Sequence, residues 1–354
     1  MTLARRSFLA SAAASVVAPA VIRSALADTP WVTFKLHHPL SSVSSAHSKF
    51  LAPWARNVEK ASGGRIRIDI FASMQLGGRP AELFDQVRDG VVDIAYAAPH
   101  TTPGRFPKIE LFELPFVPSR RALVSSKAIE DYAAANLRDE FRAVHPISFS
   151  CSDRAIIHAH RAIETVRDVK GLRLHVRTRW AGAAVTALGA RAVAMPSGQL
   201  PLAITQHVVD GCVDPWDMAS ALKLYDLLKT HTDFDQSSLS TTTFVLAMNN
   251  AAYHRLPPAL KLVIDDNSGQ VAADLAGAMW DLEAKAVADL VGQRGNPITT
   301  LAPAAVAPWR RATEPVIAMW SREMKEHNGD GDKLLASARG LLTKYADVAE
   351  PQPP

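Results

Sequence analysis

The sequence predicts an α/β protein made of two sheet-containing units that are followed by long helices. Apolar and polar residues alternate over 31–36 and 65–71, as in strands, and apolar residues recur at helical spacing over 45–60 between them. A similar succession of strand and helix patterns returns over 169–213. Alternating strands and helices are typical of sheets with parallel strands, so we expect two such sheets.

The expected elements are bounded by residues that favour turns. In the first unit, glycine pairs at 63–64 and 77–78 and an Asp-Gly pair at 89–90 separate helices from strands. The expected strands are 31–36, 65–71, 91–96, 169–176, 190–195 and 208–213, with a long extended segment at 147–158. The expected helices are 45–60, 80–88, 180–188, 199–207, 257–270, 271–294, 303–326 and 333–345.

The first 27 residues have the pattern of an export signal. A short basic region precedes an Ala/Val-rich apolar run over 7–22, and small residues at 25–27 form a cleavage site. The pair Arg5-Arg6, followed by Ser, Phe and Leu, resembles the twin-arginine signature. An uncleaved membrane anchor is the alternative, but the run is short and contains a proline. We expect a mature protein that begins near Asp28 and lies outside the cytoplasm.

The composition is that of a globular protein without strong charge bias. Of the 354 residues, 48% are hydrophobic, and the net charge is +4 with an isoelectric point near 9.1. Basic residues are interleaved with acidic ones, so nucleic acid is not an expected partner. Cys151 and Cys212 are either two buried free thiols or a disulfide, and the sequence leaves both possibilities open.

Motifs of familiar enzyme and metal sites do not occur in the sequence. It contains no Gly-x-Ser-x-Gly elbow, P-loop, GxGxxG, His-Glu-x-x-His or Cys-x-x-Cys. The adjacent His37 and His38 point to opposite faces of a strand and therefore cannot chelate one ion together. The sequence predicts no catalytic residue, no metal and no cofactor.

One stretch, GLRLHVRTRW at 171–180, places basic residues at alternate positions. Arg173, His175, Arg177 and Arg179 would share one face of a strand. Such a row is found on solvated edge strands, where it discourages edge pairing. It is also what an anion site needs, because guanidinium groups match carboxylates with two hydrogen bonds. These residues alone leave both interpretations open.

Seven motifs, taken in order, resemble those of the DctP-type substrate-binding proteins of TRAP transporters. They are QLGG (75–78), DGVVDIA (89–95), FELPF (112–116), KGLRLHV (170–176), LGA (188–190), VVDG (208–211) and LP (256–257). The resemblance covers essentially the whole mature chain. It implies a two-lobed α/β periplasmic binding protein whose lobes are joined by hinge strands and long C-terminal helices and close like a flytrap on one small organic anion.

The resemblance also implies a domain organisation and partners. The first lobe would comprise 28–150 and about 240–280, the second 151–239 and about 281–345, with a long helix spanning both and the export signal at 1–27. The protein would be a monomer in the periplasm of a Gram-negative bacterium, delivering a small organic acid to the membrane permease subunits of a sodium-driven TRAP transporter. A ligand sensor coupled to a receptor and, less favoured, a periplasmic hydrolase are the alternatives.

The resemblance identifies candidate anion-binding residues. In the family, an arginine in the motif that matches GLRLHV binds the ligand carboxylate with two hydrogen bonds. His175 occupies that position here, and Arg177 on the same face is the expected replacement. Asp214 stands where the family often has asparagine or glutamine, and it could orient Arg177 or accept a ligand hydroxyl. A second family arginine falls near Ala155, so the adjacent Arg154 is a further candidate.

Further ligand-lining positions are implied at strand ends. In the first lobe they are His37, His38, Gly78, Tyr96 and Ala98. In the second lobe Trp216 follows an expected strand, where a large ring is either core or the wall of a cleft. With Tyr96 and Trp216 flanking the ligand body, an aromatic or hydrophobic acid is the expected ligand.

Overall fold

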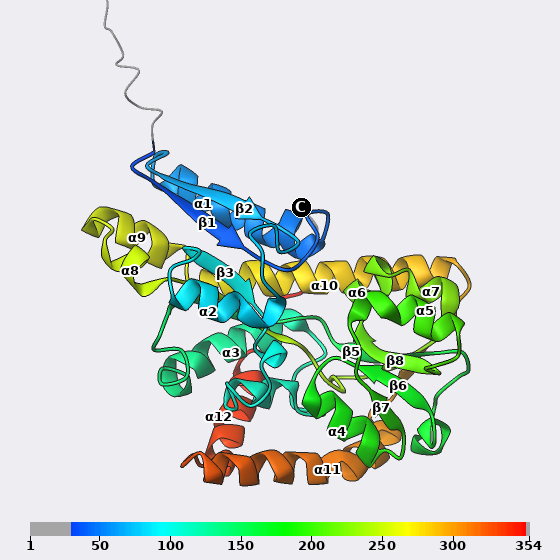
Figure 1. Ribbon diagram of the computed structural model, residues 1–354. Helices are drawn as coiled ribbons and strands as arrows, with labels where there is room; N and C mark the ends of the chain where they lie inside the picture. Colours follow the sequence, from blue (N-terminus) through cyan, green and yellow to red (C-terminus); the bar gives the residue numbers. More distant parts are fainter. Residues whose placement is uncertain (1–29, 352–354) are drawn as a thin grey trace, which may run out of the picture.

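Two mixed β-sheets, one in each lobe, organise the computed structural model, which describes residues 30–351 (Figure 1). The first sheet has the order β2 (Ile66–Phe71), β1 (Val32–His37), β3 (Ile94–Ala97), β10 (Thr243–Met248) and β4 (His145–Cys151). The second has the order β11 (Ile298–Leu301), β9 (Thr230–Phe234), β5 (Ala155–Ala159), β8 (Gly211–Pro215), β6 (Arg173–Val176) and β7 (Arg191–Val193). The predicted α/β class with two lobes is therefore confirmed.

The expectation of purely parallel sheets is wrong at the strands that join the lobes. β10 runs antiparallel to both β3 and β4, and β5 runs antiparallel to β8 and β9. The extended segment at 147–158 is two strands, β4 and β5, in different sheets. The chain crosses between lobes after β4 and again before β10, and the crossings are tied by Ser152 N–H to Thr242 O and Ala155 N–H to Ser240 O, both 2.8 Å. These paired segments form the hinge.

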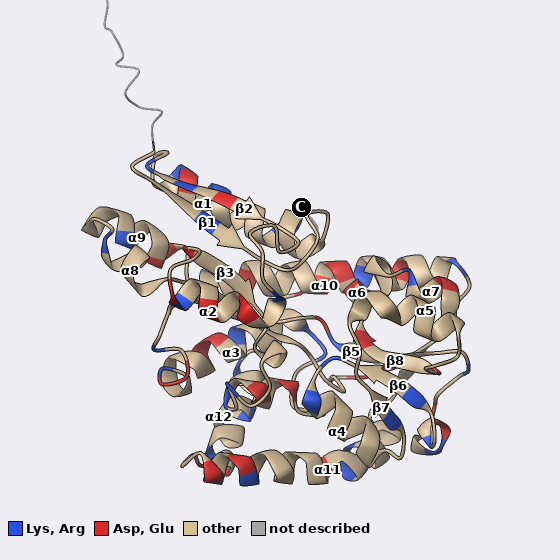
Figure 2. Ribbon diagram, in the orientation of Figure 1, with Lys and Arg blue, Asp and Glu red and all other residues tan. Residues whose placement is uncertain are grey.

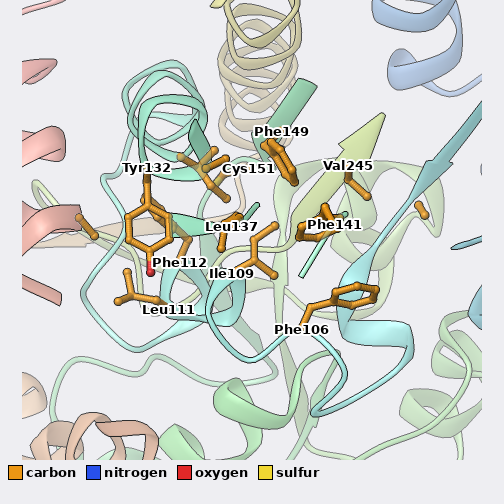
Figure 3. Packing of buried hydrophobic residues seen from close by; sticks show 14 of the residues in the cluster. Phe106, Ile109, Leu111, Phe112, Tyr132, Leu137, Phe141, Phe149, Cys151 and Val245 are labelled. Carbon is orange, nitrogen blue, oxygen red and sulfur yellow. The ribbon is translucent and has the colours of Figure 1, made fainter. Parts of the chain in front are cut away.

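Helices cover both faces of the first sheet. They are η2 (Ala46–Leu51), α1 (Ala52–Ala61), η3 (Pro80–Glu82), α2 (Leu83–Arg88), η4 (Pro99–Thr101), η5 (Ile109–Glu113), α3 (Ala122–Asn136), α8 (Asn250–His254) and α9 (Pro258–Asp266). Because strand side chains alternate between faces, Ile94 and Tyr96 of β3 pack with α1 and α9, whereas Ala95 and Ala97 pack with α2 and α3. Figure 3 shows the second of these clusters, in which aromatic rings from several segments interlock.

The second lobe has the same layered construction. Its helices are η6 (Val166–Val169), α4 (Arg179–Ala187), η7 (Ser197–Gln199), α5 (Leu200–Thr205), α6 (Trp216–Ala221) and α7 (Leu224–Leu227). Neighbouring residues of β5 again face opposite ways, with Ile157 in the cluster covered by α4 and Ile156 in the cluster covered by α5 and α6.

Helices α10 (Gln270–Gln293) and α11 (Pro303–Glu326) span both lobes, and α12 (Gly331–Lys344) follows them. Figure 1 shows α10 crossing from the first lobe to the second and α11 returning along the opposite side. In α11, Trp309 packs in the second lobe and Trp320 in the first. Leu334 and Leu335 of α12 pack with Trp320, so the expected assignment of 281–345 to the second lobe is wrong for α12 and the end of α11.

The cysteines, the charge distribution and the helix lengths can be compared with the expectations from the sequence. Cys151 and Cys212 are free and buried, one in each sheet. Figure 2 shows Lys and Arg interleaved with Asp and Glu over both lobes. Among the helices within residues 30–351, none has the length and apolar character needed to cross a membrane. The export signal expected at 1–27 lies outside the described residues.

Candidate ligand-binding site

The strand ends that face the other lobe bring the candidate residues together. β6 and β8 are parallel, with Val176 beside Val213, so Arg177 and Asp214 follow at the same edge of the second sheet. In the first sheet, β1 and β3 end, and the antiparallel β10 begins, at one edge. Burial is the main cause of the shifted pKa values of His100 and Glu113 in the first lobe, and the charge of Arg177 lowers both pKa values. The site therefore lies between the lobes.

Two of the four basic residues in the 171–180 stretch already have carboxylate partners. Arg173 donates two hydrogen bonds to Asp210, at 2.7 and 3.0 Å. Arg179 lies beyond the end of β6, on α4, and bridges Glu110 and Glu323, with its Nη2 2.6 Å from Glu323 Oε1. Neither guanidinium is free for a ligand.

His175 is a buried partner of Asp214 rather than a free donor. Its Nδ1 lies 2.8 Å from Asp214 Oδ2, and its Nε2 lies 3.3 Å from the Met195 carbonyl oxygen. Burial disfavours the charged imidazole, but the hydrogen bond and charge of Asp214 outweigh this and raise the pKa of His175. Because both neighbours are acceptors, the protonated ring can donate to both. The expectation that His175 binds the carboxylate is therefore not supported by its geometry, and Asp214 orients this histidine rather than Arg177.

Arg177 is the basic residue of this stretch that stays available. It is half-buried just after β6, and within residues 30–351 its guanidinium forms no hydrogen bond or ion pair. A guanidinium in a partly desolvated place binds a carboxylate strongly with two hydrogen bonds. This geometry supports the assignment of Arg177 as the carboxylate-binding residue.

The charge of Arg177 acts on three titratable groups that the sequence interpretation missed. Burial lowers the pKa of His100 to about 3, and the charge of Arg177 adds to this effect. Burial raises the pKa of Glu113 to about 8, and the charge of Glu110 contributes, against hydrogen bonds from Thr243 and the Arg177 charge. Burial also raises the pKa of Asp217 to about 6, although Arg177 opposes it. At pH 7 the site therefore contains a neutral histidine, a largely protonated Glu113 and a largely ionised Asp217.

Several buried polar atoms near this site have no hydrogen-bond partner within residues 30–351. In the described part of the chain they include Glu113 Oε2, Asp153 Oδ1, Asp214 Oδ1, Asp217 Oδ1, His100 Nδ1 and the Tyr96 hydroxyl. Native proteins pair nearly all buried polar groups, because each unpaired one costs desolvation free energy. Such a group of atoms is typical of a site that binds a polar ligand.

A column of aromatic rings lies on the first-lobe side of the site. The rings of Tyr96 and Phe244 stack at 4.8 Å with an interplanar angle of 10°, and those of Phe244 and Trp280 stack at 5.9 Å and 18°. Burial raises the pKa of Tyr96, and the charge of Asp217 adds to this effect. The Tyr96 ring is 1% exposed and also meets Phe50 edge-on at 5.6 Å, and Tyr96 stays a predicted ligand-lining residue.

Trp216, predicted to flank the ligand, is instead a core residue of the second lobe. It is fully buried, and its ring centroid lies 5.2 Å from those of both His158 and His231. Trp216 is the first residue of α6, directly after β8, and its side chain packs in the core of the second lobe. The next residue, Asp217, lies on the side of the site. Trp280 of α10, which no sequence motif marks, ends the aromatic column.

His37 and Gly78 fasten the 75–78 loop to the first lobe. The Leu76 N–H donates to His37 Nε2 at 3.3 Å, and His37 Nδ1 lies 2.8 Å from Gln86 Oε1. Gly78 has a φ of +86°, and a Cβ there would lie 2.5 Å from Gln86 Nε2. Both residues thus have structural roles, and no contact joins them to Arg177.

His38 and Ala98 are likewise buried in the first lobe. His38 Nε2 lies 2.9 Å from His47 Nδ1, and burial, with the charges of His47 and His37, lowers the pKa of His38 to about 4. The Ala98 carbonyl accepts a hydrogen bond from Thr101 N–H at 3.0 Å, which begins the turn that carries His100. Ala98 therefore contributes to the site by positioning His100.

Arg154 belongs to a buried ion pair. Its Nη2 lies 2.8 Å from Asp233 Oδ2, and Arg120 Nη2 lies 3.0 Å from the same oxygen. Arg154 also lines a separate cavity of about 800 Å³ between α3, α10, α11 and α12. Its guanidinium is thus paired with Asp233, which favours a structural role for Arg154.

This fold and site agree with one family of proteins. Residues 37–323 match the DctP family, described as bacterial extracellular solute-binding protein, family 7, and the chain belongs to that family. The family resemblance read from the motifs is therefore confirmed.

Similar solved structures are TRAP solute-binding proteins. One, from Rhodoferax ferrireducens T118 with copurified benzoate, is 35% identical with a TM-score of 0.84, covering 90% of this chain and 99% of that one. Another, a marine metagenome protein specific for aromatic acid ligands in complex with 3-hydroxybenzoate, is 34% identical with a TM-score of 0.85 and covers 90% and 99%. An uncharacterized protein of Sinorhizobium fredii is 25% identical over 231 residues, 64% of this chain, and the chain spans 42% of that protein's length.

Proposed function

We propose that the protein is a periplasmic receptor that closes its two lobes on a small aromatic carboxylate and delivers it to the membrane permease of a TRAP transporter. The observation that carries this proposal is Arg177, a half-buried guanidinium between the lobes without a partner among residues 30–351. The ligand carboxylate would bind the Arg177 guanidinium, and the ligand ring would lie along the column of Tyr96, Phe244 and Trp280.

The relatives support the ligand class and the receptor role. Proteins of this family bind solutes outside the cytoplasm, which favours binding over hydrolysis. Two similar TRAP proteins hold benzoate and 3-hydroxybenzoate. The predicted twin-arginine export signal at 1–27 would carry the chain into the periplasm of a Gram-negative bacterium, where the folded receptor would work as a monomer.

A thermal-shift titration of the mature protein with benzoate tests this function. A ligand that binds only the folded state stabilises it by about 2.7 kcal/mol at 100 times its dissociation constant, so the melting temperature should rise with benzoate concentration. Cyclohexylamine, a ring of similar size with the opposite charge, is the control and should give no shift. The absence of a shift with benzoate and with every other aromatic carboxylate would contradict the proposal.

A further inference from the structure

The acidic groups opposite Arg177 point to a second feature of the ligand. We propose that the ligand carries, besides its carboxylate, a hydrogen-bond donor such as a hydroxyl or amino group, and that Asp217 accepts this donor with Asp153 beside it. This inference rests on the proposed function, because it concerns the same site and the same class of ligand.

Asp153 and Asp217 are held next to each other at the hinge edge of the second sheet. Asp153 lies just before β5 and accepts the Trp216 N–H at 2.8 Å with its Oδ2, so the residue after Trp216 starts close to it. The other oxygen of Asp153 and the Oδ1 of Asp217 are buried and have no partner in residues 30–351. The Oδ1 of Asp217 is thus available to a donor, and beside it lies Asp153, whose pKa is raised well above its usual value by burial and by the charge of Asp217.

The same two carboxylates lie at the sheet edge that carries Arg177, because Asp153 precedes β5 and Asp217 follows β8 where Arg177 follows β6. The charge of Arg177 acts on Asp217, and the charge of Asp217 acts on both Asp153 and Tyr96. No ion pair joins Asp217 to Arg177 among the described residues, so neither group satisfies the other. A ligand that bonds Arg177 at one end would bring its ring past Tyr96 and a substituent towards Asp217.

A ligand with a carboxylate alone fits this arrangement poorly. It would add a negative charge beside Asp217 and leave the buried Oδ1 of Asp217 without a donor, which costs desolvation free energy. Burial raises the pKa of Asp217 only to about 6, so it stays largely ionised and accepting at pH 7. A site built to bond a ligand hydroxyl or amine discriminates strongly against an analogue that lacks it.

Isothermal titration of the wild type and Asp217→Ala tests the inference. The ligands are benzoate and its 2-, 3- and 4-hydroxy and amino derivatives. This series places the hydrogen-bond donor at each ring position in turn. For the wild type we expect at least one donor-bearing acid to bind about tenfold or more tightly than benzoate, the gain typical of a hydrogen bond to a charged group. In Asp217→Ala this ratio should fall to within about threefold, and benzoate should bind as well or better because a repelling charge is gone.

A matched control and a second variant keep the outcome interpretable. Asp226→Ala removes a carboxylate that pairs with Arg294 on the surface of the second lobe, and the ligand preference should be unchanged. If Asp217→Ala does not fold, Asp217→Asn, which keeps the side-chain shape, should also reduce the ratio. Equal affinity for benzoate and all its derivatives, or a ratio that survives in both variants, would overturn this inference alone. Failure of every aromatic acid to bind would overturn the proposed function.

Discussion

Replacing Arg177 with alanine is expected to weaken benzoate binding by at least about 100-fold while the protein stays folded. Truncating one partner of a desolvated charge pair costs about 2–5 kcal/mol, and about 1.4 kcal/mol corresponds to a factor of ten. Arg177 forms no ion pair or hydrogen bond with the rest of the described chain, so its removal should cost little stability. Isothermal titration gives the affinity, and thermal unfolding without ligand gives the stability.

Arg173→Ala is the matched control for this prediction. Arg173 lies in the same 171–180 stretch, but its guanidinium bonds Asp210 at 2.7 Å and is partly exposed. Exposed ion pairs contribute little to stability, and this one lies at the opposite end of β6 from Arg177, so benzoate affinity should stay within about twofold of the wild type. Equal affinities of Arg177→Ala and Arg173→Ala would show that Arg177 is a solvated surface residue.

Replacing Asp233 with alanine is expected to give the largest loss of stability, about 3–5 kcal/mol. The Asp233 side chain is 2% exposed and accepts hydrogen bonds from Arg154 and Arg120. These two cations outweigh the effect of burial and hold the pKa of Asp233 below its usual value. Removing one partner of a buried ion pair leaves uncompensated charge, which is the source of the large cost. Urea unfolding of the variant measures it.

The neighbouring Asp235 provides the control for Asp233. Asp235 is half-buried and no side-chain hydrogen bond or ion pair involves it within residues 30–351, so Asp235→Ala should change the free energy of unfolding by no more than about 0.5 kcal/mol. Asp233→Ala that remains folded should still bind benzoate, because Arg154 has a structural role. Wild-type stability combined with lost binding would return Arg154 to the ligand site.

Local patterns predicted the helices and most strands but not the hinge. The helix expected at 303–326 is α11 over the same residues. Helix α3 was missed because β4, α10 and α12 cover it on several sides. Residues all around the helix, such as Leu123, Ser126 and Ile129, are therefore buried, and its sequence has no amphipathic face. The antiparallel direction of β10 follows from the chain crossing between the lobes. The alternation of residues within one segment carries no information about this crossing.

The candidate site was predictable where a motif or a strand end marked it. Arg177 was selected because it lies two residues after the family position at His175. The partners that occupy Arg173 and Arg179 lie 37 to 144 residues away, so the sequence could not show that these arginines are taken. His100 and Asp217 were missed because each becomes a site residue only when it faces Arg177, which requires the tertiary fold.

A crystal structure of the protein with benzoate tests the central claim most directly. The account predicts the benzoate carboxylate between the lobes, with oxygen atoms about 2.7–2.9 Å from guanidinium nitrogens of Arg177 and the ring against Tyr96. A carboxylate bound instead by Arg154 or at the cavity between α10 and α12, with Arg177 directed into solvent, would contradict it.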